Sequence, residues 1–375
     1  MKILVCGGGI AGLSATIALQ QQGHQVSLIE RSENWQTFGA GLHLPGNSEP
    51  LLKHLGVLEA VERQSASFEQ LCYCRADGKA LFSLNVAAQG WPRFRALSRQ
   101  SFHRILLDRA DLSSARTGVA VKSVSAEGHV ILSDGTQENF DLVIGADGIG
   151  SRVRRSLFGE ACKPQETGFR CWRWIADDAD VMAYPRFVMG RGVVLLAMPL
   201  EGGKTYVFVS VHDPEEQFRE LSVAAMKKLL EQFEPGLVAR LTRDLDPHNL
   251  HEGTLQQMEM QQWSRGRVVL IGDAAHGTLP TLAQGAAQSM KDAIELAAAL
   301  DEDGEISVAL ARFERRRKPE AHWVQGQSFR RMGLARLDSP VAVFCRNALL
   351  RLLGSRILAS GWRPLIDGNF AGRPE

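Results

Sequence analysis

Residues 2–12 read Lys2-Ile3-Leu4-Val5-Cys6-Gly7-Gly8-Gly9-Ile10-Ala11-Gly12, a short apolar run that ends in glycines. Apolar residues then recur at helical spacing as far as Gly23, and a second short apolar run ends at Glu30. This order predicts a buried parallel strand, a helix and a second strand. Together they make one βαβ unit of about 30 residues.

The glycines at the first strand–helix turn follow the spacing Gly7-x-Gly9-x-x-Gly12. Gly7 permits a tight turn, Gly9 lets the backbone approach a pyrophosphate, and Gly12 lets the helix pack closely on the strand. The helix N-terminus presents free amides to the phosphates. Glu30 can accept ribose hydroxyls, and its charge disfavours the 2′-phosphate of NADP. We therefore predict a dinucleotide site, with FAD and NAD both open.

The composition of the 375-residue chain narrows the functional class. Its length predicts two or three folded units, and its 45% hydrophobic and 23% charged residues exclude disorder as the main state. The 43 basic and 42 acidic residues argue against a general nucleic-acid binder. We expect no signal peptide, no transmembrane segment and a cytoplasmic location. The six scattered cysteines predict free thiols, and we predict no metal site.

Further periodicities place the remaining elements. Helices are predicted at residues 50–63, 100–110 and 221–240, and they dominate from residue 285 onward. Strands are predicted near residues 119–125, 129–133, 141–145 and 267–271, the last two meeting glycine and aspartate. Alternation in residues 193–198 and 206–211 predicts an antiparallel hairpin. The chain thus passes from α/β to antiparallel β and back, with changes near residues 165 and 264.

Three later segments carry motifs of their own. Residues 141–154 read Asp141-Leu142-Val143-Ile144-Gly145-Ala146-Asp147-Gly148-Ile149-Gly150-Ser151-Arg152-Val153-Arg154, and residues 266–276 read Gly266-Arg267-Val268-Val269-Leu270-Ile271-Gly272-Asp273-Ala274-Ala275-His276. These resemble the DG and GD motifs of class A FAD-dependent aromatic monooxygenases, the p-hydroxybenzoate hydroxylase-like family. Residues 96–107 are similar to the segment whose second arginine contacts FAD there. The branch with quinolone and salicylate hydroxylases looks most similar.

The resemblance implies an α/β fold. A Rossmann-like FAD-binding domain is expected to interleave with a smaller mixed or antiparallel β-sheet domain for the substrate, followed by C-terminal helices. We expect the FAD-binding domain to comprise residues 1–70, 97–165 and 264–325. The substrate domain is expected at residues 71–96 and 166–263, and the C-terminal helical segment at residues 326–375.

The resemblance also implies the chemistry. The family binds FAD and takes hydride from NADH or NADPH, and its reduced flavin adds O2 at C4a. The resulting hydroperoxide transfers one oxygen atom to an aromatic ring. One dinucleotide fingerprint is enough, because the nicotinamide binds only transiently. We expect a small, apolar aromatic or quinolone-like substrate and a monomer or homodimer. No catalytic base is predicted.

Individual residues acquire roles from the same comparison. Asp273 is expected to accept a ribityl hydroxyl, and Arg104 to reach the phosphate or ribityl region, whereas Arg99 is equally well explained as a solvated charge. The amides of the helix that begins near Gly285 are expected to stabilise reduced flavin. The predicted cofactor contacts are Gly7, Gly9, Ile10, Ala11, Gly12, Glu30, Arg31, Gly41, Arg104, Val121, Asp147, Gly272, Asp273, Pro280, Gly285 and Ala286. The predicted substrate contacts are His43, Arg173, Leu196, Met198 and Tyr206, for which core or rim positions are the alternative.

Some features depart from the family or stay open. Ala283 and Ala287 replace the usual outer residues of the loop before the helix, and Lys291 replaces the usual acid before Asp292. A flavin reductase of the same fold is one alternative, and the W-x-W pattern of residues 172–174 suggests a halogenase as another. Residues 341–353 fit either an interfacial membrane helix or, as we prefer, a helix packed on the flavin domain with snorkelling arginines.

Overall fold

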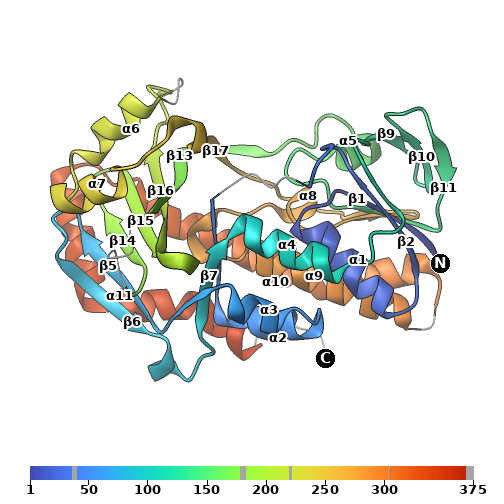
Figure 1. Cartoon of the computed structure of the whole chain (residues 1–375), viewed down its shortest axis with the longest axis horizontal. Helices are drawn as coiled ribbons and strands as arrows, with labels where there is room; N and C mark the ends of the chain where they lie inside the picture. The colour runs from blue at the N-terminus through green and yellow to red at the C-terminus, as the bar shows by residue number, and fades with distance from the viewer. Residues whose placement is uncertain (36–39, 178–182, 219–221, 303, 369–375) are drawn as a thin grey trace.

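The structure, a computed structural model, describes residues 1–35, 40–177, 183–218, 222–302 and 304–368. Two β-sheet halves lie at opposite ends of the elongated molecule (Figure 1). The chain crosses between the halves several times, so each half is built from separated segments. The long helix α10 (Ile306–Ala335) contributes to the apolar cores of both halves.

One half contains a six-stranded sheet that is parallel except for its edge strand β18. The apolar runs predicted as buried strands form its centre, where β1 pairs with both β2 and β12. The strand order is β18 (Ser264–Arg265), β19 (Val268–Leu270), β12 (Leu142–Gly145), β1 (Lys2–Cys6), β2 (Gln25–Glu30) and β8 (Ala115–Thr117). Helices α1 (Ile10–Gln21), α4 (Arg99–Arg109) and α9 (Gly285–Asp301) share its core. The predicted βαβ unit is therefore present.

The first turn of this unit depends on two glycines. A Cβ atom on Gly12 would lie 1.8 Å from the carbonyl oxygen of Gly7. Gly7 itself has a φ of +110°, and its Cβ would lie 2.5 Å from the carbonyl oxygen of Ala146. Helix α1, β1 and β12 thus approach each other at a distance that leaves no room for side chains.

The other half contains a seven-stranded mixed sheet. Its order is β17 (His251–Gln257), β13 (Gln165–Asp177), β16 (Lys204–His212), β15 (Val193–Pro199), β14 (Arg186–Met189), β5 (Gln70–Arg75) and β6 (Ala80–Asn85). The predicted hairpin is β15–β16, joined by the short helix η3 (Glu201–Gly203), and β14 pairs with β5 in parallel. One face packs on α6 (Val223–Leu230) and α7 (Pro235–Leu241), and the other faces the first half.

Two predicted helices are interrupted, which the periodicity alone did not indicate. Residues 50–63 form α2 (Glu49–His54) and α3 (Leu58–Arg63), because Gly56 adopts a φ of +71° between them. The predicted helix 221–240, whose first residue lies outside the described residues, is divided into α6 and α7, because Pro235 begins a new helix at its first position. In both cases a residue that cannot continue the helix lies within an apolar period.

Two small sheets and α5 (Arg152–Phe158) complete the first half. One of these sheets has the strand order β3 (Gly41–Leu44), β7 (Phe94–Ser98) and β4 (Ala66–Phe68). The other has the order β11 (Gln137–Asn139), β10 (His129–Leu132) and β9 (Val121–Val124). The interleaved α/β architecture matches the expectation. The domain limits stay a prediction; the expected limit at residue 97 falls inside β7, and that at residue 325 falls inside the continuous helix α10.

The last helix, α11 (Pro340–Asp367), begins with the Ser339 hydroxyl capping the Ala342 amide. It packs mainly along β6, at the edge of the seven-stranded sheet. The sequence placed it instead on the domain that contains the six-stranded sheet. Within the described residues, no helix has the length and apolarity to cross a membrane.

Replacing Gly12 with alanine is expected to lower the free energy of unfolding by about 3 kcal/mol or more, because the new Cβ would overlap a backbone oxygen that cannot move aside. Thermal or urea unfolding measures the effect. Gly253→Ala on β17 is the control, because its Cβ meets no atom within 4 Å. Equal stability of the two variants would contradict the tight packing of α1 on β1.

Candidate functional site

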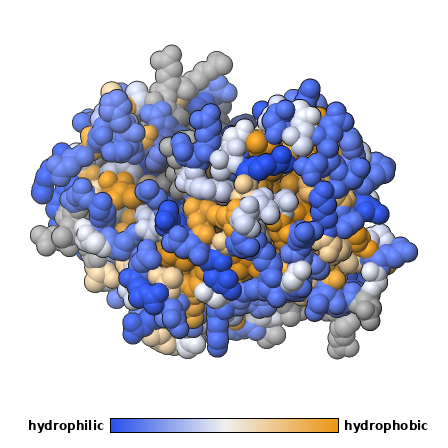
Figure 2. Space-filling view, turned by 45° about the vertical axis from the view of Figure 1, so that its right-hand side comes forward, coloured by the Kyte–Doolittle hydropathy of each residue, from blue (hydrophilic) through white to orange (hydrophobic). Residues whose placement is uncertain are grey.

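A cavity of about 380 Å³ lies between the two halves. Figure 2 shows apolar side chains exposed in the depression between the halves, surrounded by hydrophilic ones. One wall is made of the glycine-containing turns of the first half, and the opposite wall is one face of the seven-stranded sheet. The end of α10 and the inner face of α11 close the remaining side.

The first wall brings predicted cofactor residues together from four distant segments. A Cβ atom placed on Gly9, Gly148 or Gly285 would meet no atom within 4 Å, so the backbone there faces open space. Helices α1 and α9 begin at this wall, which directs their free amides and positive dipole ends toward it. The predicted contacts on the cavity surface are Gly9, Ile10, Ala11, Gly41, Asp273, Pro280, Gly285 and Ala286.

Polar groups at this wall have unused hydrogen-bonding capacity. Arg99 Nε and Thr278 Oγ1 are buried and have no hydrogen-bond partner among the described residues. Asp273 also reaches the cavity surface, where burial raises the pKa of its carboxyl and the nearby Arg99 and His276 oppose that rise. Glycine turns, helix N-termini, a cation and a carboxylate fit the phosphates and hydroxyls of a dinucleotide.

The two arginines of α4 differ in their surroundings. Arg99 lines the cavity at the start of the helix, close to Asp273, and burial lowers the pKa of its guanidinium. The Arg104 side chain is 73% exposed and forms an ion pair with Asp108 at 3.0 Å on its own helix. Arg104 is therefore outside the cavity surface, and Arg99, which the sequence left undecided, is the arginine of this helix that faces the cavity.

The other predicted cofactor contacts lie beyond the cavity surface. Glu30 accepts a hydrogen bond from the Gly8 amide at 2.7 Å, so its carboxylate adjoins the glycine turn. Arg31 is exposed just after β2, and the side chain of Val121 is buried within the small sheet. Gly7, Gly12 and Gly272 lie within the turns, where a Cβ atom on any of them would come within 3 Å of a neighbouring atom. The roles of these residues remain predictions.

The Asp147 carboxylate makes hydrogen bonds within its own turn, and its cofactor contact stays a prediction. Its carboxylate accepts hydrogen bonds from the Ser151 hydroxyl at 2.5 Å and from the Arg152 and Val153 amides at 2.7 and 3.2 Å. The two amides are free backbone groups at the start of α5, so the Asp147 side chain caps that helix. Its neighbour Gly148 lines the cavity instead. The glycine of this motif faces the cavity, and the aspartate fixes the turn.

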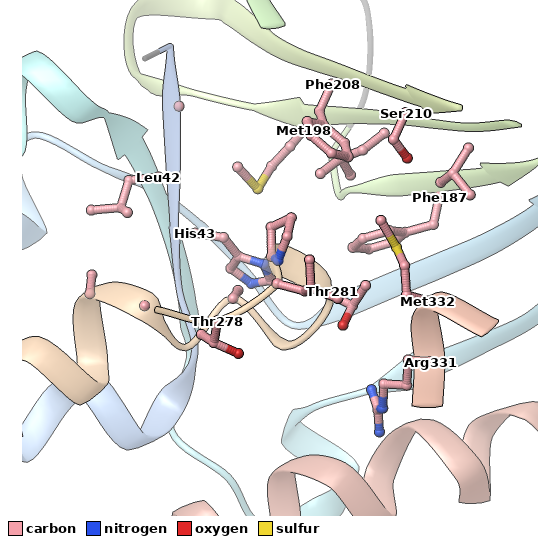
Figure 3. Close-up of a pocket in the computed structure, with 18 of the residues that line it drawn as sticks. Leu42, His43, Phe187, Met198, Phe208, Ser210, Thr278, Thr281, Arg331 and Met332 are labelled. Atoms are coloured by element: carbon pink, nitrogen blue, oxygen red, sulfur yellow. The ribbon is translucent and has the colours of Figure 1, made fainter. Parts of the chain in front are cut away.

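Gly41 and His43 bring strand β3 up to the opposite wall. A Cβ atom on Gly41 would lie 2.3 Å from the Tyr206 ring, so only glycine allows this approach. The His43 ring packs between Phe68 and Phe94, with ring centroids 5.4 and 5.6 Å away. Burial lowers the pKa of His43 to about 3, so the ring is neutral at pH 7. Figure 3 shows it near the middle of the cavity.

The second wall is the alternating face of the seven-stranded sheet. All five predicted substrate contacts line the cavity: His43 from β3, and Arg173, Leu196, Met198 and Tyr206 from this sheet. The intervening residues point to the other face, as strand geometry requires. Trp172 and Trp174 belong to that second set and are fully buried there, with the Trp174 Nε1–H donating to the Leu241 carbonyl at 2.8 Å. The W-x-W pattern is therefore part of the core.

Sequence reasoning missed the far end of this wall. The rings of Phe82, Tyr73 and Phe187 stack in that order, with centroids 4.7 and 4.6 Å apart and nearly parallel planes. All three line the cavity, together with Arg331 of α10 and Ile357 of α11. Figure 3 shows Phe187 on the sheet side and Arg331 on the helical side of the cavity. Alternation in β5 and β6 was the available signal, whereas nothing in α11 marks its inner face as a cavity wall.

A buried ionic cluster lies behind the first wall, which carries the predicted cofactor contacts. The Asp292 carboxylate accepts hydrogen bonds from the Gly272 amide and from Arg317 Nε, both at 2.8 Å, and lies 2.5 Å from His276 Nε2. Burial alone would raise the pKa of Asp292, but His276, Arg317 and the Gly272 amide outweigh it and hold the pKa at about 2. The cluster ties the turn that carries Asp273 to helices α9 and α10.

This fold and site define a flavoprotein with a separate apolar substrate wall opposite its cofactor turns. The comparisons agree: residues 1–324 match the FAD binding domain family, so the chain belongs to that family. A 2-heptyl-3-hydroxy-4(1H)-quinolone synthase of Pseudomonas aeruginosa is 31% identical, over 94% of each chain. A 6-hydroxynicotinate 3-monooxygenase of Pseudomonas fluorescens is 29% identical, covering 86% of this chain and 89% of the relative.

Solved structures show the same architecture. A variant of Klebsiella pneumoniae HpxO complexed with FAD superposes with a TM-score of 0.88 at 25% identity, covering 97% of this chain and 98% of that one. The chain is an FAD-dependent monooxygenase of the aromatic hydroxylase class, with NADH or NADPH as co-substrate. The predicted family, cofactor and enzyme class are confirmed, and the reductase and halogenase alternatives are not supported.

Arg99→Met is expected to weaken FAD binding about 10- to 100-fold, because it removes a charge-assisted hydrogen-bond donor from the cavity wall. Titration of the apoprotein with FAD, followed by flavin fluorescence, measures the dissociation constant. Arg104→Met removes the same charge from the outside of the same helix and is expected to change it little. The reverse order would restore Arg104 as the cofactor arginine.

Asp292→Asn is expected to lower the free energy of unfolding at pH 7 by about 3–5 kcal/mol, because His276 and Arg317 lose a buried partner. The folded-state pKa of about 2 is below the unfolded value of about 3.9, so the carboxylate stabilises the fold above pH 4. That contribution is lost as the pH falls through about 2, and the variant should lack it. Urea unfolding at several pH values measures both effects, with Asp108→Asn as the exposed control expected to change little.

Proposed function

We propose that this monooxygenase hydroxylates a fused, largely apolar aromatic ring of the quinolone kind that carries an apolar side chain. The observation that carries the proposal is the length of the substrate wall. Cavity residues come from six neighbouring strands, from Arg173 on β13 to Phe82 on β6. At a strand spacing of about 4.8 Å, this wall is roughly 24 Å wide. A single ring would cover only a fraction of it.

The two ends of the wall differ in chemistry. At one end Arg173 and Tyr206 lie close enough to Arg99 for their charges to interact, so polar groups of both walls meet there. At the other end, the stacked rings meet α11, where a Cβ atom on Gly354 would lie 2.2 Å from Phe82. A polar heteroaromatic ring fits the first end, near the cofactor turns, and an apolar chain fits the second.

The protein's own residues would orient the reactants and exclude water. Bound FAD supplies the redox and oxygen-transfer chemistry. Asp273, Arg99 and the N-terminus of α9 would hold it against the first wall, and the apolar sheet face would shield the reacting ring from solvent. Burial raises the pKa of Tyr206 to about 12, so its phenol keeps its proton and can donate a hydrogen bond to a ring carbonyl.

The relatives support the quinolone class without deciding it. The name of the quinolone synthase specifies a product with a heptyl chain on a fused ring, whereas the name of the 6-hydroxynicotinate enzyme specifies a single small ring. The stacked aromatic residues and the α11 residues of this cavity favour the former. O2 as oxygen source, a monomeric or homodimeric state and a cytoplasmic location are further parts of the proposal. Holoenzyme incubated with 2-heptyl-4-quinolone and NADH or NADPH should form a product heavier by one oxygen atom, and nicotinamide oxidation without that product would contradict the proposal.

Ile357→Trp is expected to lower kcat/KM for 2-heptyl-4-quinolone at least about 100-fold, because the larger side chain fills the space for several buried methylene groups of the chain. The 2-methyl analogue should be affected little, since its ring binds at the other end. Steady-state kinetics with both substrates measures the selectivity, and Ile357→Val is the control. An equal loss for both substrates would place the chain elsewhere.

A further inference from the structure

Helix α11 exposes an apolar stripe to solvent. Among the described residues, eight large hydrophobic side chains are exposed, and five of them belong to the first half of this helix. Val341 and Phe344 are each 74% exposed, and Leu352 is 80% exposed. Scattered exposed leucines are ordinary in soluble proteins, but a cluster on one helix marks an interaction surface. The outer stripe consists of Val341, Phe344, Cys345, Ala348, Leu349 and Leu352.

The helix differs from an ordinary amphipathic helix, because two opposite faces of it are apolar. Its opposite face carries Leu350, Ile357 and Leu358, which line the substrate cavity. At 100° per residue these side chains point away from the outer stripe. Buried Arg346 fixes this orientation by donating hydrogen bonds to the carbonyl oxygens of Gly190 at 2.9 Å and Met189 at 3.4 Å. The stripe therefore stays outward while the inner face completes the cavity.

The charges beside the stripe indicate what covers it. Residues 340–366 contain four arginines and no acidic residue. Arg351 and Arg356 are exposed; Arg351 borders one side of the stripe, and Arg356 lies one turn beyond Leu352 at its C-terminal end. A second copy of the same helix would add further arginines and no acidic residue from 340–366, so it offers these cations no complementary charge. An anionic, partly apolar surface complements both the side chains and the charges.

We propose that α11 docks its outer stripe on an anionic lipid surface, with Phe344 and Leu352 inserted among the acyl chains and Arg351 and Arg356 at the headgroups. Such interfacial binding depends on buried apolar area together with attraction to anionic lipids. The helix lies in the interface and does not cross the bilayer. It would place the α11 side of the substrate cavity next to the bilayer, where an apolar substrate accumulates. The docking itself does not depend on the identity of that substrate.

Vesicle sedimentation tests the proposal with the FAD-loaded full chain. Vesicles of phosphatidylcholine and phosphatidylglycerol should bind the protein at least about tenfold more tightly than phosphatidylcholine alone, and added salt should weaken the binding. Phe344→Ser with Leu352→Ser should reduce binding at least about tenfold, because two large apolar side chains are lost. Arg351→Gln with Arg356→Gln should remove the preference for anionic lipid. Val308→Ser, at another exposed apolar site, is the control and should bind like the parent protein.

A second measurement uses the exposed thiol of Cys345, which lies within the stripe. An environment-sensitive dye on this thiol, in a Cys162→Ser background, should shift its emission to shorter wavelength on anionic vesicles. Neither double variant touches the cavity, so turnover of a dissolved 2-methyl-4-quinolone should stay within twofold of the parent. Failure to bind anionic vesicles, equal binding by the stripe variant, or a homodimer that the stripe substitutions dissociate would overturn the proposal. Absence of quinolone turnover would overturn the proposed substrate and leave the vesicle result standing.

Discussion

The buried carboxylate of Asp292 connects the parts of the chain on which the site depends. It binds the Gly272 amide behind the cofactor turns and Arg317 in α10, and it lies against His276. Helix α10 then continues to Arg331 and Met332, which line the substrate side of the cavity. An ionised group at this depth is tolerable only because every charge in the cluster has a partner. The relative placement of the cofactor turns and the long helix thus depends on a few short hydrogen bonds between buried groups.

The sequence predicted those features that follow from local rules. A buried parallel strand followed by Gly7-x-Gly9-x-x-Gly12 has few structural alternatives, and strict alternation in residues 193–198 and 206–211 assigned side chains such as Met198 to one face of the sheet. Features that depend on tertiary placement could not be derived in the same way. Arg99 and Arg104 are five residues apart on one helix, and only the packing of α4 decides which of them faces the cavity. The sequence likewise did not indicate that the carboxylate of Asp147, a predicted cofactor contact, accepts hydrogen bonds from the amides of α5.

The C-terminal helices were the least predictable part for a related reason. Hydrophobic periodicity identifies a buried face by contrast with a polar one. Helix α11 is apolar on both faces, so its periodicity could not separate the face toward the cavity from the face toward solvent. The interruptions at Gly56 and Pro235 show the opposite limitation, because there the apolar period continues while the backbone does not.

The loop before α9 contains a residue with a Cβ atom in a left-handed conformation. Ala283 has a φ of +54°, a left-handed conformation that costs a residue with a Cβ atom about 1 kcal/mol or more. Lys291, in place of the usual acid, forms an ion pair with Glu320 of α10. The departures from the family pattern therefore bring local strain just before Gly285, where α9 begins, and an ion pair between α9 and α10.

The course of the chain limits how the substrate wall can be exchanged between related enzymes. Strands β5 and β6 enter the seven-stranded sheet about 90 residues before β13, and α11 reaches the same cavity only at the end of the chain. No single contiguous fragment therefore carries the specificity of this enzyme. A chimaera that inherits only β13–β16 would combine these strands of one parent with β5, β6 and α11 of the other parent. Coherent transfer of specificity requires the exchange of three separate segments, which takes five crossovers, each placed in a loop outside the βαβ unit.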